Sequence, residues 1–503
     1  MTKIINLNNF KLISSISAAL FLGKISGFLR DWLVVKKMGA NLLSDFALIL
    51  ITIPDLMVSL LIGGGFAAAV IPEFKSIKKD DAYRLFLQLF LLILILFSLL
   101  AFLLSYFSIN FIYLLAPGLP LEFIQNNIQL FWVTTIAIPL TACSGIVKAK
   151  LDSYNLFLYG AFGTLIFNVS IIFLIFFPFS LSFMESVAIG ILIGAFVRIL
   201  MQSIGISKIR RTLIKNDNHN RINRKFLLSL FKALTFSSLL FLLPIISRAI
   251  ASTESEGSFT LFNFSYVLNE LPITLIFGAI LTILLTKLSE MHNNGSLENL
   301  TSAIAINIKL SILISLSICI PIIFYSYELT EFIFSSTNLT EADISSISMM
   351  VMISYCFLPF RALISILFPI LSAINGLKNL LLISILMIST LLFSSLILIN
   401  NYGLNGIMIA YGLTNLVGTF FMLCLLYIKL GINVFIKIFR SPLKSFLMPI
   451  LASMLINYIG VSYFSGALGM IFFGFFSAII FFLVFNSNDK ESLFRSFSKE
   501  NYS

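Results

Sequence analysis

Long apolar runs separated by short polar connections repeat along this chain from one end to the other. Each run is close to the 20 or so apolar residues that cross a bilayer as a helix. The runs are continuous, without the strict alternation of a membrane β-strand. The sequence therefore predicts an all-α polytopic membrane protein of about 14 transmembrane helices, at residues 9–35, 42–72, 84–107, 124–147, 154–178, 185–207, 226–250, 258–286, 303–326, 345–373, 379–399, 404–428, 443–461 and 465–486.

Composition supports this class. Of the 503 residues, 59% are hydrophobic and only 11% are charged, whereas globular domains carry about 25% charged residues. The short polar N-terminus has no small-residue cleavage site, so we expect no removable signal peptide. The cysteines stand singly in apolar segments, without metal or disulfide spacing, and are expected to be inert core thiols. They are Cys143, Cys319, Cys356 and Cys424.

The net charge of +11 is unevenly distributed between the connections on the two sides of the predicted membrane. Lys and Arg gather in alternate connections, most densely in 208–225, while most of the other connections carry acids and no base. By the positive-inside rule both termini are cytoplasmic. Lys36 and Lys37, in the first outward connection, are the exception. The basic residues thus indicate orientation and contact with anionic membrane lipids, and no nucleic-acid partner is expected.

The polar stretch 208–225 also suggests the domain organisation. It separates six runs from the next six, and two more follow. We predict an N-terminal lobe of spans 1–6 (1–215), a C-terminal lobe of spans 7–12 (216–430) and two additional spans with a cytoplasmic tail (431–503). The two lobes are only weakly alike in sequence, so an internal repeat is a hypothesis.

The first apolar run contains charges. Lys24, Gly27 and Asp31 form one helical stripe, and Gly23, Ser26 and Arg30 form another about 100° away. A charge at the bilayer centre costs about 2.5–3.5 kcal/mol on insertion scales, so such residues usually face a watery cavity. Small residues between them favour close helix contact. The alternative is an Arg–Asp pair that snorkels to the membrane surface.

Further charges lie within later runs: Asp45, Arg248, Glu270 and Arg361. Arg248 fits the outer membrane interface as well as the interior. Together with Lys24 and Arg30 these residues give an excess of positive charge, and Arg and Lys neutralise phosphate. The sequence therefore predicts unpaired cations lining a chamber for a phosphate-bearing amphiphile. The substrate contacts would be Lys24, Arg30, Arg248 and Arg361, and the acids Asp31, Asp45 and Glu270 would orient them and contribute to coupling.

Glycine and proline interrupt several runs. Gly63, Gly64 and Gly65 fall in the second and Pro272 in the eighth. Broken helices are tolerated at membrane depth where the freed backbone lines a cavity or is bonded again by neighbours. These residues are the predicted hinges, and for any single proline an ordinary kink is the competing interpretation.

Other function classes fit less well. An enzyme would need paired acids, metal ligands or a histidine nucleophile at catalytic spacing, and none is apparent, so we expect no catalytic residues and no metal. ATP-driven transport lacks a G-x-x-x-x-G-K-[ST] loop. A purely structural or receptor role leaves the charges unexplained. A secondary transporter or flippase that alternates access between two halves remains.

Several short motifs in order resemble one family. They are G-F-L-R-D (27–31), M-G-A (38–40), S-D-F (44–46), I-P-D-L (53–56), G-G-F-A-A-A-V-I-P-E-F (64–74), S-G-I-V-K-A-K-L-D-S-Y-N-L-F (144–157), F-N-V-S (167–170) and 266–289. The chain resembles the MurJ/MviN family of lipid II flippases, within the superfamily of multidrug and polysaccharide exporters.

The resemblance implies fourteen spans, two lobes around a cationic cavity, and a groove for the lipid tail on the last two spans. It implies transport of a polyprenyl-diphosphate-linked peptidoglycan precursor from the cytoplasmic to the periplasmic leaflet of the bacterial inner membrane by alternating access. No cofactor is implied; membrane potential is the expected driver, and a coupling cation is left open. We expect a monomer near cell-wall synthesis enzymes. An exporter of another polyprenyl-linked saccharide and a drug/cation antiporter are the alternatives.

Residue by residue, the match is incomplete. Arg30 and Asp31 match the family's Arg–Asp pair, Asp45 its second-span acid and Glu270 its eighth-span acid, while Lys24 stands where Arg is usual. Val58, Gly63 and Val267 occupy places where the family usually has Arg, Glu and Arg. Either Arg248 or Arg361 replaces the missing cation from another helix, or the substrate or activity has diverged.

Overall fold

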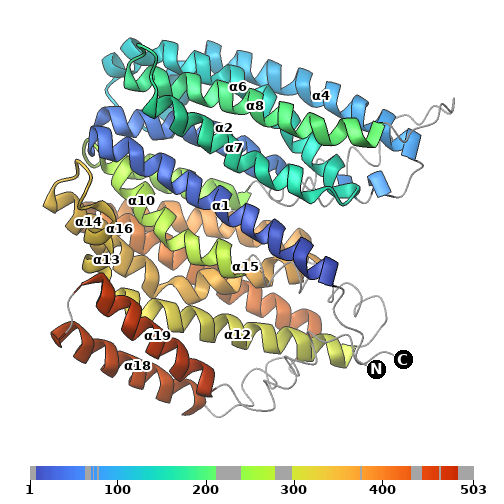
Figure 1. Cartoon of the computed structure of the whole chain (residues 1–503). Coiled ribbons are helices and arrows are strands. Elements are labelled where there is room, and N and C mark those ends of the chain that lie inside the picture. The colour runs from blue at the N-terminus through green and yellow to red at the C-terminus, as the bar shows by residue number, and fades with distance from the viewer. Residues whose placement is uncertain are drawn as a thin grey trace. The chain divides into compact units, whose positions relative to one another are not determined.

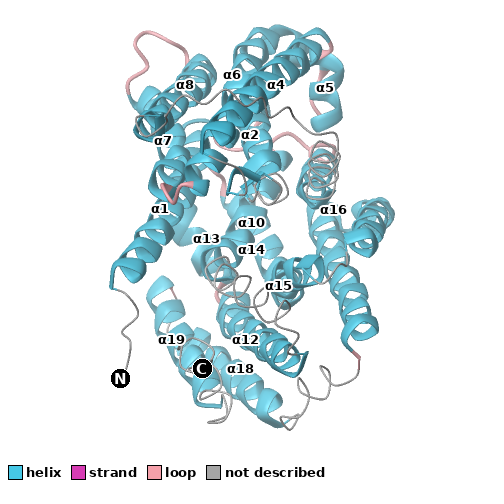
Figure 2. Ribbon diagram, turned by 90° about the vertical axis from the view of Figure 1, so that its right-hand side faces the viewer, coloured by secondary structure: helices cyan, strands magenta, loops and turns pink. Residues whose placement is uncertain are grey.

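The computed structural model describes residues 7–62, 70–71, 73–75, 79–210, 239–277, 297–373, 377–431, 444–463 and 466–484. Within these segments the regular elements are all helices, joined by short loops (Figure 2). The predicted all-α class is therefore confirmed. The chain forms two compact units, residues 1–260 and 261–503. The predicted lobe boundary at 215/216 falls in 211–238, outside the described residues, and stays a prediction.

Unit 1 is organised around one long helix, α6. Helices α4 and α8 lie along it (Figure 1), and α2, α5 and α7 also pack against it, while α1 packs on α7 and α2. The bounds are α1 Leu7–Met38, α2 Leu42–Ile62, α4 Lys79–Tyr106, α5 Ser108–Leu115, α6 Leu121–Ser153, α7 Phe157–Phe176 and α8 Phe183–Arg210. A further helix, Leu239–Ala251, precedes α10 (Ser258–Pro272).

Glycines allow the helices of unit 1 to approach closely. A Cβ added at Gly194 would lie 2.8 Å from the Phe167 carbonyl oxygen, and one added at Gly190 would lie 3.0 Å from the Cα of Ile171. Both contacts bring the backbones of α7 and α8 together. Small residues serve this purpose in membrane bundles, where lipid tails are as apolar as leucine and van der Waals packing drives helix association.

In unit 2, α12 has the corresponding central place. Helices α14, α15, α18 and α19 pack against it, and α18 and α19 also pack on each other (Figure 1). The bounds are α12 Leu297–Phe324, α13 Ser326–Phe334, α14 Glu341–Cys356, α15 Leu358–Ala373, α16 Leu377–Leu430, α18 Lys444–Tyr463 and α19 Ala467–Val484. The two additional spans of the sequence therefore attach to unit 2 through α12.

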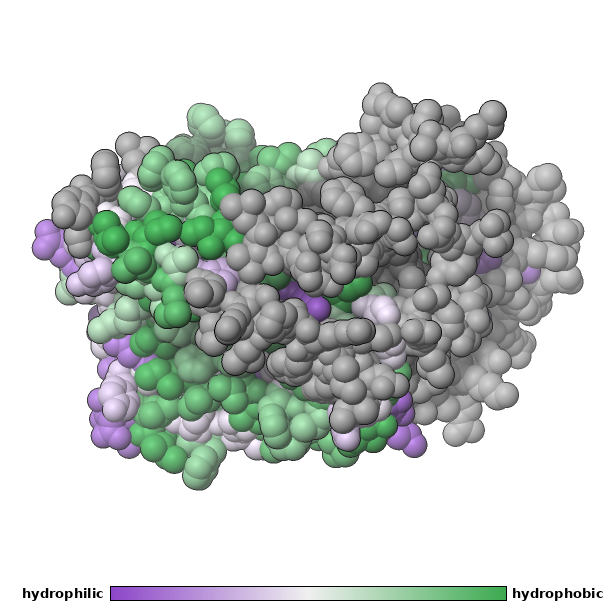
Figure 3. Space-filling model, turned by 90° about the horizontal axis from the view of Figure 1, so that it is seen from below, coloured by the Kyte–Doolittle hydropathy of each residue, from purple (hydrophilic) through white to green (hydrophobic). Residues whose placement is uncertain are grey.

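The apolar surface fits a membrane protein. Figure 3 shows hydrophobic side chains over much of the described surface in view, with hydrophilic side chains mainly toward its margins. Along α4, Leu91, Ile95, Leu99 and Phe102 are 56–68% exposed. Such a row on a soluble protein would be an aggregation hazard, whereas in a bilayer it contacts lipid tails.

The helices follow the predicted spans closely. Among the described residues, six helices are long and apolar enough to cross a membrane, or seven if α14 and α15 count as one bent span. Within α16 the backbone is non-helical at Gly403 (φ 52°), between the predicted spans 379–399 and 404–428. Glycine adopts this angle without a Cβ clash. The full count of fourteen stays a prediction, because parts of several spans fall outside the described residues.

Two helices of unit 2 are broken, and one side-chain hydrogen bond joins them near their breaks. Helix α10 ends at Pro272 and continues as a π-helical turn, η1 (Ile273–Phe277). Proline lacks the N–H that would bond the carbonyl of residue 268. The hydroxyl of Tyr355, in the last turn of α14, donates to that Leu268 carbonyl at 3.0 Å. Helices α14 and α15 are themselves bent by 53° across Phe357. The predicted break at Pro272 is present; Gly63, Gly64 and Gly65 lie outside the described residues.

Replacing Tyr355 by Phe should destabilise the protein by about 1–2 kcal/mol, because it leaves a buried carbonyl without a donor. In a Pro272→Ala background, alanine supplies the missing N–H, and the same replacement should cost less. Thermal unfolding of the four purified proteins in detergent measures this double-mutant cycle. Tyr327→Phe, at a residue that is 43% exposed, is the control. Equal costs in both backgrounds would contradict the assigned role.

Candidate functional site

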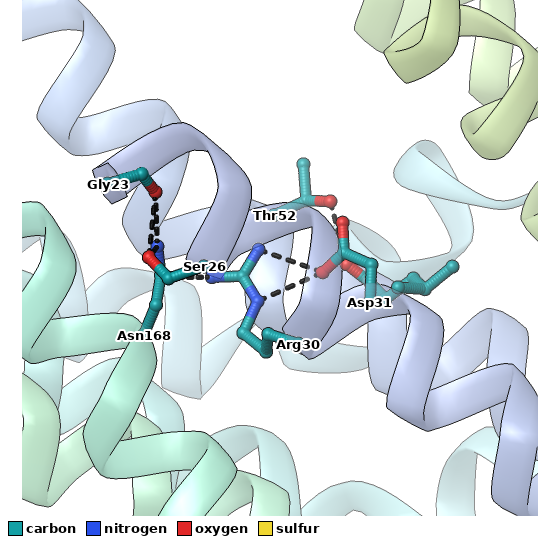
Figure 4. Close-up of polar contacts among 7 residues, drawn as sticks. Gly23, Ser26, Arg30, Asp31, Thr52 and Asn168 are labelled. Atoms are coloured by element: carbon teal, nitrogen blue, oxygen red, sulfur yellow. Dashed lines mark hydrogen bonds and ion pairs between the residues drawn. The ribbon is translucent and has the colours of Figure 1, made fainter. Parts of the chain in front are cut away.

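A buried polar cluster joins α1 to α7 in unit 1 (Figure 4). The side-chain amide of Asn168 donates to the Gly23 carbonyl at 3.0 Å and to the Ser26 hydroxyl at 3.2 Å. Its oxygen accepts from Arg30 Nη1 at 2.8 Å. A Cβ added at Gly27 would lie 3.3 Å from the same amide nitrogen. The predicted stripe of Gly23, Ser26 and Arg30 is therefore the face of α1 that packs on α7.

Arg30 is fully engaged in this cluster. Its Nε and Nη2 lie 2.9 Å from Asp31 Oδ1, and Nη1 bonds Asn168. The residue is only 3% exposed. The expectation that Arg30 is an unpaired cation facing a chamber is wrong. A buried guanidinium is tolerated where a carboxylate pairs with it and further hydrogen bonds use its remaining donors, and α7 supplies the acceptor that α1 lacks.

Lys24 has different surroundings. It lies on the same helix as Arg30 but is exposed, whereas its neighbours Gly23 and Ser26 are buried against α7. Within the part of the chain that the structure describes, its amine has no hydrogen bond or ion pair. Of the two predicted cations of the first span, Lys24 is therefore the one available to a ligand.

Asp45 binds backbone rather than a cation. Its Oδ2 accepts from the Gly257 N–H at 2.9 Å, and its Oδ1 accepts from the N–H and the hydroxyl of Thr260 at 2.9 and 2.6 Å. These groups belong to the start of α10, whose first N–H groups have no partner within the helix. Asp45 therefore caps α10 from α2, where the carboxylate also interacts favourably with the helix dipole.

The chain approaches this cap closely. Gly257 has φ +82°, and a Cβ there would lie 2.5 Å from the Ala40 carbonyl carbon. Glycine meets both conditions, a left-handed backbone and a close contact.

Replacing Asp45 by Asn should lower the stability of the protein by about 1–3 kcal/mol, because the amide nitrogen would face an N–H donor. Glu254→Gln, an equivalent change at an exposed acid of the same connection, should have little effect. The measurement is thermal unfolding in detergent. A cavity role without capping predicts loss of activity at unchanged stability, the opposite pattern.

Arg248 lies near the end of the helix Leu239–Ala251, one turn before the acidic connection that contains Glu254 and Glu256. A small cavity in unit 1 is lined by Ile49, Thr52, Leu115, Ile245, Arg248 and Phe259. Arg248 is half-buried there. The position suits the interface interpretation left open by the sequence.

In unit 2, Arg361 and Glu270 form an ion pair. Arg361 Nε donates to Glu270 Oε1 at 2.7 Å, and the two side chains are 23% and 16% exposed. Glu270 comes two residues before the break at Pro272, and Arg361 follows the bend at Phe357. The sequence separated the two residues by 91 positions, and the structure brings them together.

The sequence interpretation missed several functional candidates. Asn168 stands in the motif F-N-V-S (167–170), and a lone amide in an apolar span was the available signal. Lys150, which the predicted span 124–147 leaves in a connection, is completely buried near the end of α6, with its amine 4.5 Å from the Phe74 ring centre and 5.0 Å from that of Tyr154. Helix α6 extends to Ser153, six residues beyond the predicted span, which explains the error.

Similarity to known proteins identifies the family. The family model described as "Lipid II flippase MurJ" matches residues 34–479, most of the chain. The chain belongs to the MurJ family. Among curated relatives, the probable lipid II flippase MurJ of Buchnera aphidicola subsp. Acyrthosiphon pisum is 27% identical over 348 residues, covering 67% of this chain and 68% of the relative. That of Borreliella burgdorferi is 22% identical over 440 residues, covering 84% and 85%.

Solved structures agree on the fold. A lipid II flippase MurJ in an inward closed conformation superimposes with a TM-score of 0.77 at 21% identity, covering 93% of this chain and 98% of that one. An inward-facing multidrug resistance MATE family transporter of the MOP superfamily gives 0.66 at 15% identity, covering 83% and 96%. The MurJ fold is thus matched over more of this chain, and with a higher score, than this MATE fold.

Replacing Asn168 by Leu should destabilise the protein by about 1–3 kcal/mol, since Arg30 would lose its acceptor on α7, and the Gly23 carbonyl would lose one of its two side-chain donors. Ser170→Ala is the matched control, because Ser170 bonds only the Ile166 carbonyl of its own helix. Thermal unfolding in detergent and the amount of protein in the membrane are the measurements. Equal stability of the two variants would show that the cluster does not hold α1 on α7.

Proposed function

We propose that this protein moves lipid II, a polyprenyl-diphosphate-linked peptidoglycan precursor, from the cytoplasmic to the periplasmic leaflet of the bacterial inner membrane. The family match over residues 34–479 carries the proposal. The curated relatives named as lipid II flippases support it, since the similarity extends over two thirds or more of their length in the first two. The proposed activity is transport, without a covalent step.

The physical problem in such transport is the head group. A diphosphate carries charge that the hydrocarbon core does not solvate, and the protein must supply donors and positive charge along the way. In unit 1 the proposal assigns this contact to Lys24, which is exposed and uncommitted among the described residues. Arg30, Asp31 and Asn168 are assigned to the framework that holds α1 in place.

Alternating access is the proposed mechanism. Broken helices at membrane depth are a feature of secondary transporters, and α10 and α14–α15 are broken in unit 2. In this proposal both termini are cytoplasmic, as the basic connections indicate, and the protein works as a monomer near cell-wall synthesis enzymes. Membrane potential or a coupling cation would drive the cycle.

The second candidate is another transport substrate of the same superfamily. The fold also superimposes on a MATE transporter, so export of a different polyprenyl-linked saccharide or a drug/cation antiport is the alternative. Lysine at position 24, where arginine is usual, and valine at 267 favour keeping this alternative in the test.

The test is complementation of bacteria depleted of their own lipid II flippase. The wild-type chain should restore growth. Lys24→Ala should reduce lipid II flipping by about tenfold or more, because one charged contact is lost, while the amount of protein in the membrane stays normal. Lys24→Arg keeps the charge and should keep the flipping activity. Lys378→Ala, at an exposed position at the start of α16, is the charge-matched control.

Two outcomes would contradict the proposal at different levels. A wild-type chain that inserts well but fails to restore growth would move the function to another lipid-linked saccharide or to antiport, and substrate-dependent efflux in vesicles would identify the latter. Full rescue by Lys24→Ala would retain the function and reject the assigned contact.

A further inference from the structure

Two arginines of the described residues, Arg30 and Arg361, pair with acids and are held in different ways. Arg30 uses Nε and Nη2 on Asp31 and Nη1 on Asn168. Arg361 uses Nε alone, on Glu270. In the described part of the chain, the two terminal amino groups of Arg361 have no hydrogen bond. A guanidinium offers five N–H donors in a fixed fork, so four of them remain on Arg361.

The spare donors are accessible. The Arg361 side chain is 23% exposed, compared with 4% for that of Arg30. On α10, the residues from Leu261 to Ser265 are buried, while Tyr266, Val267 and Glu270 are partly exposed. Arg361 therefore extends from α15 to a partly open stripe of α10, whereas Arg30 is enclosed between α1 and α7.

The Arg361 guanidinium is also pre-oriented. An Nε–carboxylate bond fixes the plane of the fork. One N–H of a terminal amino group lies on the same edge as Nε and faces the acid, while the outer edge, with one N–H from each terminal amino group, is left for a ligand. Around it, the Tyr355 hydroxyl bonds the Leu268 carbonyl, and the Thr419 hydroxyl of α16 bonds the Phe360 carbonyl at 2.9 Å. These bonds fix the two backbone segments that carry the pair. The entropy cost of ordering the Arg361 side chain is therefore already met in the protein without a ligand.

The Arg361–Glu270 pair suits an anionic ligand that binds and leaves in each transport cycle. An isolated arginine would cost several kcal/mol in a membrane interior, and the Glu270 carboxylate offsets that cost when no ligand is present. A phosphate brings oxygen acceptors that match the free edge of the fork in a bidentate geometry. A lysine ammonium is a point charge and cannot bind two phosphate oxygens in this bidentate geometry.

We propose that Arg361 is the contact of unit 2 for the diphosphate of the transported lipid, with Glu270 as its positioning residue. The proposal rests on the proposed lipid transport and adds which cation of unit 2 binds the head group. Of the two replacements for the cation absent at Val267, it selects Arg361 over Arg248.

The test is binding of undecaprenyl diphosphate to the purified full-length protein, with undecaprenol as the uncharged comparison. Arg361→Ala should weaken diphosphate binding by roughly 10- to 100-fold, the range for a charged hydrogen-bonded contact, and leave undecaprenol binding unchanged. Arg361→Lys should bind between the two. Lys429→Gln, an exposed cation in the last turn of α16, should bind as the wild type does.

A positioning role for Glu270 has its own readout. Glu270→Gln keeps an oxygen acceptor for Arg361 Nε and should bind the diphosphate at least as well as the wild type, because the pair gains net positive charge. Glu270→Ala removes the acceptor and should weaken binding. Loss of binding in Glu270→Gln as severe as in Arg361→Ala would overturn the positioning assignment.

A second-site variant separates binding from folding. Val267 lies one helical turn before Glu270 on the same partly exposed stripe, so Val267→Arg can return a guanidinium to this region. Val267→Arg with Arg361→Ala should recover diphosphate binding and complementation. If Arg361→Ala is poorly produced, the double variant Arg361→Ala with Glu270→Ala leaves no unpaired carboxylate and should show the same loss of binding at normal membrane levels.

The failures are distinguishable. If the wild type restores growth and binds the diphosphate, but Arg361→Ala and the double alanine variant do so equally well, Arg361 is not the contact and the proposed function stands. If the wild type inserts normally but neither restores growth nor binds the diphosphate, the proposed function fails, and the assignment of Arg361 fails with it.

Discussion

Within a bilayer, an ionised side chain needs a partner, a hydrogen-bonding shell or water, because the hydrocarbon core offers none of these. Three buried ionisable side chains among the described residues of unit 1 have different surroundings. Arg30 has a carboxylate and an amide, Asp45 has the unpaired N–H groups at the start of α10, and Lys150 lies between two aromatic rings. Each solution ties a charge to a particular helix contact, so the charges also specify how the helices of unit 1 pack.

The backbone faces the same requirement where helices break. At Pro272 the carbonyl of Leu268 loses its helical donor, and the Tyr355 hydroxyl of another helix replaces it. Near the bend at Phe357, the Thr419 hydroxyl bonds a neighbouring carbonyl. In both places a side chain of a different helix supplies a hydrogen bond and so links the two helices. The link still allows the helices to move relative to each other, because a single hydrogen bond is worth only about 1 kcal/mol net. Broken helices of this kind combine low intrinsic rigidity with satisfied backbone groups.

The sequence predicted the helices well because apolar length is a local property. The ends of α7, α8 and α19 fall within three residues of the predicted spans. It also singled out Arg30, Asp31, Glu270 and Arg361, and it offered a pair of the adjacent Arg30 and Asp31 as an alternative. It could not tell that Arg361 pairs with Glu270, since these residues are 91 positions apart in the chain. Asn168 shows the limit most clearly: an amide within an apolar run becomes a key residue only when α1 lies against it.

The number of buried cations is therefore a poor guide to function. A better guide is how many N–H groups of each cation make no hydrogen bond within the protein. Arg30, which holds α1 on α7, uses all three of its side-chain nitrogens in bonds within the protein. A binding arginine has to keep donors for the ligand, and an acid on Nε lets it do so at tolerable cost. If Arg361 has this role, the partly exposed stripe of α10 receives its guanidinium from α15. Arginine at 361 would then supply the positive charge that valine at 267 does not.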